Sequence, residues 1–169
     1  MKKLILVFSA VVFTTVAVKA QDAEKSTTVS LGVNVGVPTS SPSVYSIGFG
    51  ADLQADFSVA PTTRITASAG YENFTIKSSF RDLTGDKSTG IVPLLAGAKF
   101  FFGTSGQLYG HAQLGYGFST QKGGGGSFAY APSLGYYFSP NFDGSVKYLA
   151  FSNEGSTLGI IGVRLAYNF

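Results

Sequence analysis

The sequence predicts an all-β chain that folds as an eight-stranded antiparallel up-and-down transmembrane β-barrel. Three observations lead to this prediction: segments in which apolar residues alternate with small or polar ones, connections that alternate between short turns and longer loops, and a low content of charge. Charged residues make up 12% of the chain, about half the share found in soluble domains. The 169 residues suffice for one domain, and the absence of cysteine excludes disulfides and cysteine-based sites.

The clearest strand is the segment 45–59. Its odd-numbered residues are all apolar, and its even-numbered residues are all small or polar. Because successive side chains of a strand point to opposite faces, this pattern indicates one strand with two different surroundings. At about 3.4 Å per residue it reaches roughly 50 Å, more than a bilayer core requires.

The other strands are expected in chain order at 28–37, 64–72, 91–102, 107–118, 128–138 and 142–150, and from residue 157 to the C-terminal Phe169. A bulge is expected at Asn73 and Phe74, where the alternation slips. Short turns are predicted near 60–63, 103–106 and 139–141, and longer loops at 38–44, 78–89, 119–127 and 152–156. An even number of strands with short turns at one end and loops at the other is typical of outer-membrane barrels.

Residues 1–20 have the layout of a secretory signal peptide, with a basic start, an apolar run over 4–18 and removal after Ala20. A membrane-anchor helix is the alternative, disfavoured because the run is shorter than the about 18 residues that a span needs. Residues 21–27 are then a short periplasmic lead-in, and residues 28–169 form the barrel domain.

The charge balance points away from nucleic acid as a partner. The formal net charge is +3, but three of the twelve basic residues lie in the predicted signal peptide, which leaves nine against nine acidic ones. Binding to nucleic acid depends largely on neutralising phosphates with basic side chains. A mature chain without net charge is therefore not expected to bind it.

Two architectures have alternating strands of this kind: a soluble barrel with an apolar interior, and a membrane barrel with an apolar exterior. The polar face is dominated by small residues, which suit the narrow lumen of a closed eight-stranded barrel. No charged residue falls on the apolar face in these registers, where Lys or Arg at mid-membrane would cost about 2–4 kcal/mol. Aromatic residues gather near both ends of the strands, as in interfacial belts, although Phe and Tyr also simply favour strands. The membrane barrel is the favoured interpretation.

The charged residues on the polar face are the most informative candidates for function. They are Asp52, Asp56, Glu72 and Asp143 on the acidic side and Lys99, Lys147 and Arg164 on the basic side. Buried charges require partners, so opposite signs are expected to pair across the lumen, to fix the strand register and to close the barrel to ions. The alternative is a gated narrow pore in which a pair exchanges partners.

The single histidine, His111, is expected to point inward between Tyr109 and Gln113. A lipid-modifying hydrolase could use it as a general base with a serine, but no serine with an orienting carboxylate lies at a suitable spacing. An interior hydrogen-bonded role is favoured, and no catalytic residue is assigned. No metal or cofactor site is assigned either, because Asp52 and Asp56 lie about 13 Å apart along one strand.

Four segments carry a resemblance to a known family: residues 91–102 (IVPLLAGAKFFF), 108–117 (LYGHAQLGYG), 131–138 (APSLGYYF) and the ending VRLAYNF. With them, residues 28–169 resemble the OmpA/OmpX-type family of outer-membrane β-barrels. The resemblance implies the fold but no single activity, since such barrels include adhesins, structural proteins and small channels. The ending with Tyr167 and Phe169 resembles the signal that the barrel-assembly machinery recognises. The best-known member continues into a peptidoglycan-binding domain, and because this sequence ends at Phe169, anchoring to the cell wall is not expected.

These observations predict a bacterial outer-membrane protein, exported through the periplasm and monomeric, in contact with membrane lipids. Its expected role is structural or adhesive, with host or cell-surface ligands contacted through the longer loops. A narrow pore for ions or small solutes is the alternative, and a lipid-modifying enzyme is a third possibility.

Overall fold

The computed structural model describes residues 27–40, 44–79, 81, 87–103, 106–121 and 123–169. The predicted signal peptide, residues 21–26 of the predicted lead-in, and residues 80 and 82–86 of the predicted loop lie outside these residues. The strands are β1 (Thr27–Pro38), β2 (Tyr45–Ala60), β3 (Thr63–Ile76), β4 (Ser88–Phe102), β5 (Leu108–Ser119), β6 (Gly126–Ser139), β7 (Phe142–Asn153) and β8 (Ser156–Asn168). Among the described residues, no helix is long and apolar enough to cross a membrane.

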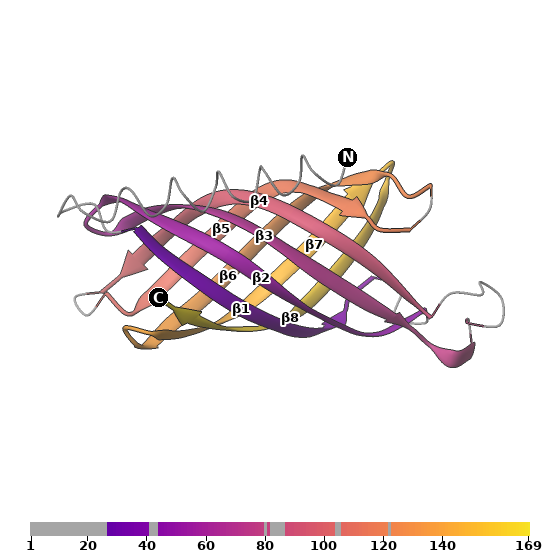
Figure 1. The fold of residues 1–169 in the computed structure, drawn as a ribbon, viewed down its shortest axis with the longest axis horizontal. Coiled ribbons are helices and arrows are strands. Elements are labelled where there is room, and N and C mark those ends of the chain that lie inside the picture. The colour runs from indigo at the N-terminus through magenta and orange to yellow at the C-terminus, as the bar shows by residue number, and fades with distance from the viewer. Residues whose placement is uncertain (1–26, 41–43, 80, 82–86, 104–105, 122) are drawn as a thin grey trace, which may run out of the picture.

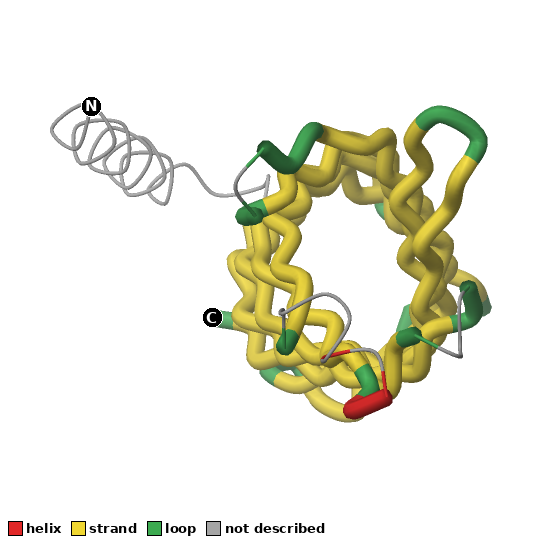
Figure 2. The backbone as a smooth tube through the Cα atoms, turned by 90° about the vertical axis from the view of Figure 1, so that its right-hand side faces the viewer, coloured by secondary structure: helices red, strands yellow, loops and turns green. Residues whose placement is uncertain are grey.

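The strands form one closed barrel in which each strand is antiparallel to its neighbours in the sequence (Figure 1). The ring closes through β1 and β8, which pair from Ser30 with Asn168 to Pro38 with Ile160. Figure 2 shows the closed ring of strands in end view. Closure pairs both edges of the sheet, so no edge strand is left. The predicted eight-stranded antiparallel barrel is confirmed.

The two ends of the barrel differ. We call the end that carries the β1–β2, β3–β4, β5–β6 and β7–β8 connections the loop end. The opposite end carries the β2–β3, β4–β5 and β6–β7 connections and the C-terminal Phe169, and we call it the turn end (Figure 1).

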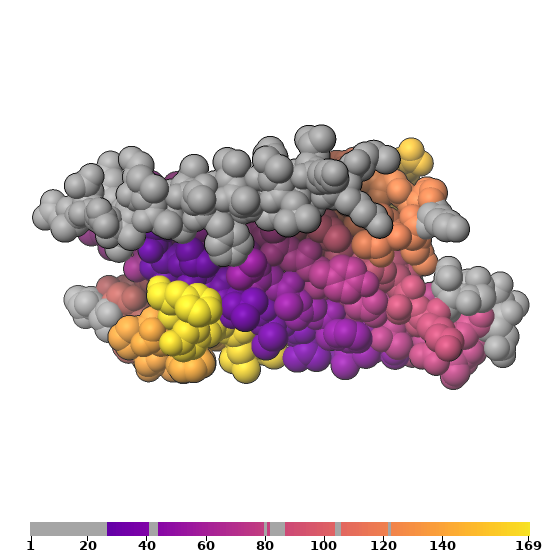
Figure 3. Space-filling view, viewed as in Figure 1, coloured from indigo at the N-terminus to yellow at the C-terminus, as the bar shows by residue number. Residues whose placement is uncertain are grey.

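Apolar side chains cover the outside of the barrel, and Figure 3 shows one side of this surface. Leu53 is 49% exposed, and many other large apolar side chains on all eight strands are exposed to a similar degree. None of the charged side chains of the strands, all of which the structure describes, is in an exposed position. The predicted assignment of the two faces is therefore found along most of each strand.

A bulge near the loop end is found on β2, and not on β3 as predicted. On β2, Tyr45 pairs with Ile76 but Ile47 pairs with Thr75, so Ser46 is an additional residue. A single additional residue reverses the face to which the next side chain points. Tyr45, predicted on the outward face, therefore turns inward and packs on Phe74 with ring centroids 6.0 Å apart.

The pairing of β3 with β2 continues without a shift through Asn73 and Phe74. Phe74 is fully buried and points into the lumen, as do Glu72 before it and Ile76 after it. The alternation of apolar and polar residues slips here because an apolar residue, Phe74, lies on the inward face of a regular strand. The predicted bulge at Asn73 and Phe74 is wrong.

The fourth connection at the loop end is shorter than predicted. β7 and β8 remain paired up to Asn153 and Ser156, so Glu154 and Gly155 form a two-residue turn. Their φ angles of 47° and 83° are typical of the type I′ turn, whose twist matches that of the paired strands. The loop predicted at residues 152–156 is thus a tight hairpin.

Candidate functional site

Two layers of inward-facing side chains line the interior of the barrel. Near the loop end lies an apolar cluster drawn from five strands, which we call the apolar plug. It consists of Phe74, Ile91, Leu95, Ala129, Ala131, Leu149, Phe151 and Ile160. Phe74 and Phe151 pack edge to face at its centre, with ring centroids 6.2 Å apart.

Glycines on the inward faces provide the space for these large side chains. A Cβ atom at Gly117 of β5 would lie 2.5 Å from the ring of Phe151, closer than carbon atoms approach each other. Similarly, a Cβ at Gly48 of β2 would overlap the Cδ1 atom of Ile160. The alternation of glycine with large apolar residues on neighbouring inward faces therefore lets the narrow lumen be packed to the centre.

The second layer is polar and extends from the middle of the barrel to the turn end. The eight predicted lumen residues lie in this layer or at its boundary. Lys147 is partly buried, and the other seven are buried: Asp52, Asp56, Glu72, Lys99, His111, Asp143 and Arg164. Five of these residues form ion pairs with one another: Asp52 and Asp143 with Arg164, and Asp56 with Lys99.

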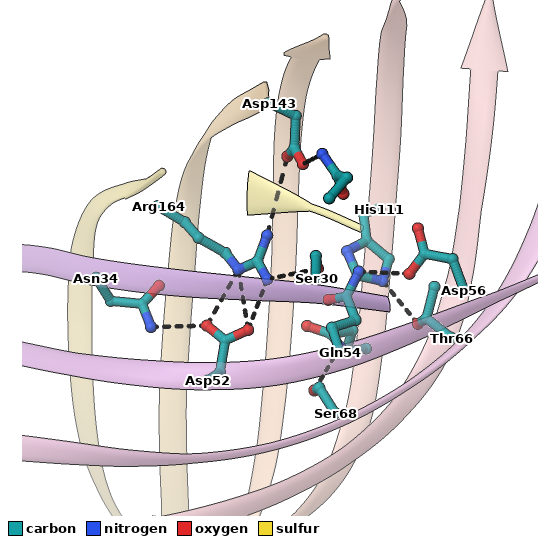
Figure 4. Close-up of polar contacts among 12 residues, drawn as sticks. Ser30, Asn34, Asp52, Gln54, Asp56, Thr66, Ser68, His111, Asp143 and Arg164 are labelled. Carbon is teal, nitrogen blue, oxygen red and sulfur yellow. Dashed lines mark hydrogen bonds and ion pairs between the residues drawn. The ribbon is translucent and has the colours of Figure 1, made fainter. Parts of the chain in front are cut away.

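Arg164 and Asp52 form the central ion pair of this layer (Figure 4). The guanidinium donates to the carboxylate through Nη2 at 2.7 Å and through Nε at 3.0 Å. Asn34 donates to the same carboxylate at 2.8 Å, and Arg164 also donates to the hydroxyl of Ser30 at 3.2 Å. These contacts join β1, β2 and β8, so the network spans the seam at which the barrel closes.

Asp143 forms a second centre nearer the turn end. It accepts hydrogen bonds from Tyr109 Oη at 2.5 Å and from Asn168 Nδ2 at 3.0 Å. Its distance to Arg164 Nη1 is 3.9 Å, at the outer limit of an ion pair. The single carboxylate thus links residues of β5, β7 and β8.

Lys99 is the most deeply buried cation among the residues that the structure describes, with 1% of its surface exposed. Its ammonium donates to Asp56 at 2.6 Å and to Tyr137 Oη at 3.3 Å. It also lies 4.5 Å from the ring centroid of Tyr109, within the range of cation–π attraction. A buried ammonium requires such a set of partners, because desolvation without them costs several kcal/mol.

Glu72 and Lys147 are not joined to the network by direct contacts. No ion pair and no hydrogen bond connects either side chain to another of the described residues. Both side chains line a small cavity between the apolar plug and the polar layer, together with Asn34.

His111 shares a 2.8 Å hydrogen bond between its Nε2 atom and Thr66 Oγ1 (Figure 4). The hydroxyl partner is therefore a threonine from β3, and Thr66 is only 1% exposed. A nucleophile that a lipid substrate cannot reach does not support catalysis. Among the described residues, no group of three or more His, Cys, Asp or Glu side chains could hold a metal ion.

Sequence reasoning did not single out several partners of the charged residues. Tyr109, Tyr137 and Gln54 share the inward parity of the predicted charges, and Gln54 donates to Asp56 at 2.7 Å. The parity was visible in the sequence, but the pairing across the lumen was not. The apolar plug was also missed as a unit.

The two residues of the predicted assembly signal lie on the outside of β8 and at its end. Tyr167 is 41% exposed and Phe169 is 73% exposed, with ring centroids 5.0 Å apart. The backbone N–H of Phe169 donates to the carbonyl of Val29 at 2.9 Å, which ties the C-terminus to β1. Recognition by the assembly machinery stays a prediction.

No protein-family model and no curated protein matches the sequence. The structure is similar to that of Ail, the attachment invasion locus protein of Yersinia pestis, with 17% identity, a TM-score of 0.61 and coverage of 86% of this chain and 99% of that one. It is also similar to the N-terminal β-barrel domain of Pseudomonas aeruginosa OprF, with 14% identity, a TM-score of 0.58 and coverage of 86% and 100%.

A de novo designed transmembrane β-barrel is similar as well, with 18% identity, a TM-score of 0.52 and coverage of 84% of this chain and 95% of that one. At identities this low, the similarity shows a shared fold and not a shared activity.

Proposed function

Because this chain has the eight-stranded barrel fold of the OmpA/OmpX type, we propose that it is a bacterial outer-membrane protein with a structural or surface-binding role. It carries no catalytic activity in this proposal. Its outward face contacts lipid acyl chains, its turn end faces the periplasm, and its loop end faces the outside of the cell. This orientation places the four loop-end connections where a host or cell-surface ligand would meet them.

The packed interior is the observation that carries the proposal. The apolar plug fills the lumen near the loop end, and the ion pairs of Arg164 with Asp52 and of Lys99 with Asp56 fill it below. An apolar constriction excludes water and therefore ions, and the charges of Arg164, Asp52, Lys99 and Asp56 are already engaged with one another. Both features support a role on the surface of the barrel in preference to passage through its interior.

The longest connection between strands lies at the loop end and supports a binding role. The β3–β4 connection is the longest, and Arg81 within it donates to the backbone carbonyl of Ile76 at 2.8 Å, which holds this residue against the end of β3. The similarity to Ail is a similarity to a protein named for attachment. This similarity supports the proposed surface-binding role.

The binding role is tested in a strain that lacks the protein and is complemented with two versions of it. One is the natural chain, and the other has residues 78–87 replaced by a two-residue Asn-Gly turn, which β-hairpins favour. We expect the natural chain alone to restore attachment to host cells, while both restore resistance to detergent. If the shortened version restores both attachment and detergent resistance fully, this loop is not the binding surface. If both versions restore detergent resistance but neither restores attachment, the role is purely structural.

Closure of the lumen is tested by planar-bilayer recording on the purified protein. We expect no conductance steps from the natural chain. Discrete steps would contradict the closed lumen and favour the alternative, a narrow pore for ions or small solutes.

A lipid-modifying activity is tested by His111→Ala in the same strain. We expect unchanged lipid A and phospholipid profiles, because His111 is a buried partner of Thr66. A changed profile that the natural chain corrects would restore the enzyme hypothesis.

A further inference from the structure

A small cavity lies at the boundary between the two interior layers. Its volume is about 20 Å³, and it is lined by Asn34, Val35, Glu72, Lys147, Leu149, Ile160, Gly162 and Val163. Leu149 and Ile160 belong to the apolar plug, Val35 and Val163 are also apolar, and Asn34, Glu72 and Lys147 supply the polar groups. A cavity needs roughly 10–15 Å³ of such volume to hold one water molecule.

The polar groups that line this cavity make no hydrogen bond or ion pair with one another. Asn34 Oδ1 is the buried side-chain polar atom among the described residues that has no hydrogen-bond partner. Glu72 is only 3% exposed, and no ion pair or hydrogen bond joins it or Lys147 to another described residue. An unsatisfied buried polar group is costly, and such groups are almost always paired with protein or with ordered water.

The three groups come from three different strands. Asn34 lies on β1, Glu72 on β3 and Lys147 on β7, and β3 and β7 face each other across the ring of eight. The Nδ2 atom of Asn34 is already used, since it donates to Asp52. Its Oδ1 atom has no hydrogen-bond partner and remains available to a donor.

We propose that this cavity is a binding site for one ordered water molecule that bridges Asn34, Glu72 and Lys147. The water donates to Asn34 Oδ1 and to the Glu72 carboxylate and accepts from the Lys147 ammonium. This arrangement uses both of its protons and one lone pair, and about three hydrogen bonds are typical of buried water. Through Asn34, the water joins Glu72 and Lys147 to the Arg164–Asp52 pair, and the polar network becomes continuous up to the apolar plug.

The proposal does not depend on the role of the barrel in the cell, because a closed or a conducting barrel could hold this water. A crystal structure of the natural chain that resolves ordered water tests it directly. We expect a density peak within hydrogen-bond distance of Asn34 Oδ1 and a Glu72 carboxylate oxygen. An empty cavity, or a direct hydrogen bond between Lys147 Nζ and Glu72 that fills it, would overturn the proposal.

Filling the cavity from its apolar side gives a second test. Leu149→Phe places additional carbon atoms where the water lies. Leu149→Met keeps the number of side-chain heavy atoms, but its longer, unbranched chain extends into the same space with little change in volume. If the site holds water, both variants leave the polar groups unsatisfied, and we expect the urea midpoint of unfolding to fall. If the cavity is dry and empty, filling it stabilises the protein and the midpoint of Leu149→Met rises, which would contradict the proposal.

Leu95→Phe is the matched control, because Leu95 belongs to the apolar plug but does not line the cavity. It measures the cost of overpacking alone. We expect the density peak to remain in this variant and to be lost in Leu149→Phe. If the density peak remains in both variants, the water lies elsewhere and the assignment is wrong.

Discussion

At the scale of single residues, the interior shows how charges are accommodated in a membrane barrel. Arg164 and Asp52 are both buried, and each makes a further hydrogen bond, to Ser30 and from Asn34 respectively. A Cβ atom at Gly32 of β1 would lie 2.5 Å from Arg164 Nε, so glycine there leaves the guanidinium room to lie flat against the wall. Burial of an ion pair becomes tolerable only when its remaining donors and acceptors are satisfied in this way.

We expect Arg164→Leu to lower the free energy of unfolding by about 3–5 kcal/mol, because it leaves the buried Asp52 carboxylate without its cation. The double variant Arg164→Leu with Asp52→Leu removes both charges and should recover a large part of this loss. Urea unfolding in lipid vesicles measures both.

Lys87→Leu is the control for that experiment, because the Lys87 side chain is exposed at the loop end and its loss should change stability by no more than about 0.5 kcal/mol. An Arg164→Leu variant that is as stable as the natural chain would show that the pair contributes nothing to the fold.

At the scale of elements, hairpin connections determine where each strand stops and which face its side chains take. The β7–β8 turn is the tightest at the loop end, and both of its residues have positive φ. Glycine adopts that conformation without steric cost, whereas other residues strain against the following carbonyl. Gly155 therefore allows the pairing of β7 and β8 to extend to Asn153 and Ser156.

We expect Gly155→Ala to destabilise the barrel by about 1 kcal/mol, because alanine is strained at a φ of 83°. Hydrogen exchange of the amides at the loop end of β7 and β8 should also become faster. Gly125→Ala is the matched control, since Gly125 is exposed and a Cβ there would meet nothing closer than Asn153 Nδ2 at 3.9 Å. Equal effects of the two substitutions would show that the turn conformation is not the cause.

At the scale of the whole molecule, the barrel separates three environments. Its exterior is apolar over all eight strands, its interior near the loop end is apolar, and its interior toward the turn end is charged. The first of these suits acyl chains and the other two fill the lumen. The outward orientation of the apolar face therefore suits the barrel to a lipid bilayer.

This orientation predicts that an arginine on the outward face has a cost that depends on depth. Leu53 lies in the middle of β2, paired with Leu31 and Ala69, and Leu53→Arg should cost about 2–4 kcal/mol in a lipid bilayer. Val59→Arg, near the turn end of the same strand and face, should cost about 0–1 kcal/mol. Free energies of unfolding in vesicles of defined lipid measure both, and equal costs at the two positions would contradict a lipid-facing surface.

The sequence alone determined the eight strands and, along most of their length, the face on which each side chain lies. That information is local, because residues i and i+2 of a strand lie on the same face wherever the strand is placed. It therefore predicted which way Asp52, Lys99 and Arg164 point. It also predicted the closed barrel, since a narrow lumen requires small residues on one face throughout.

Only the tertiary structure decided which of the inward side chains meet. Asp52 and Arg164 are 112 positions apart in the sequence, and their contact depends on the registers of the strands and on the closure of β1 on β8. The same closure gathers the apolar plug from five strands, and one additional residue at Ser46 turns Tyr45 toward it. A contact across the lumen depends on the register of every strand pair around the ring. No single segment of the sequence carries that information.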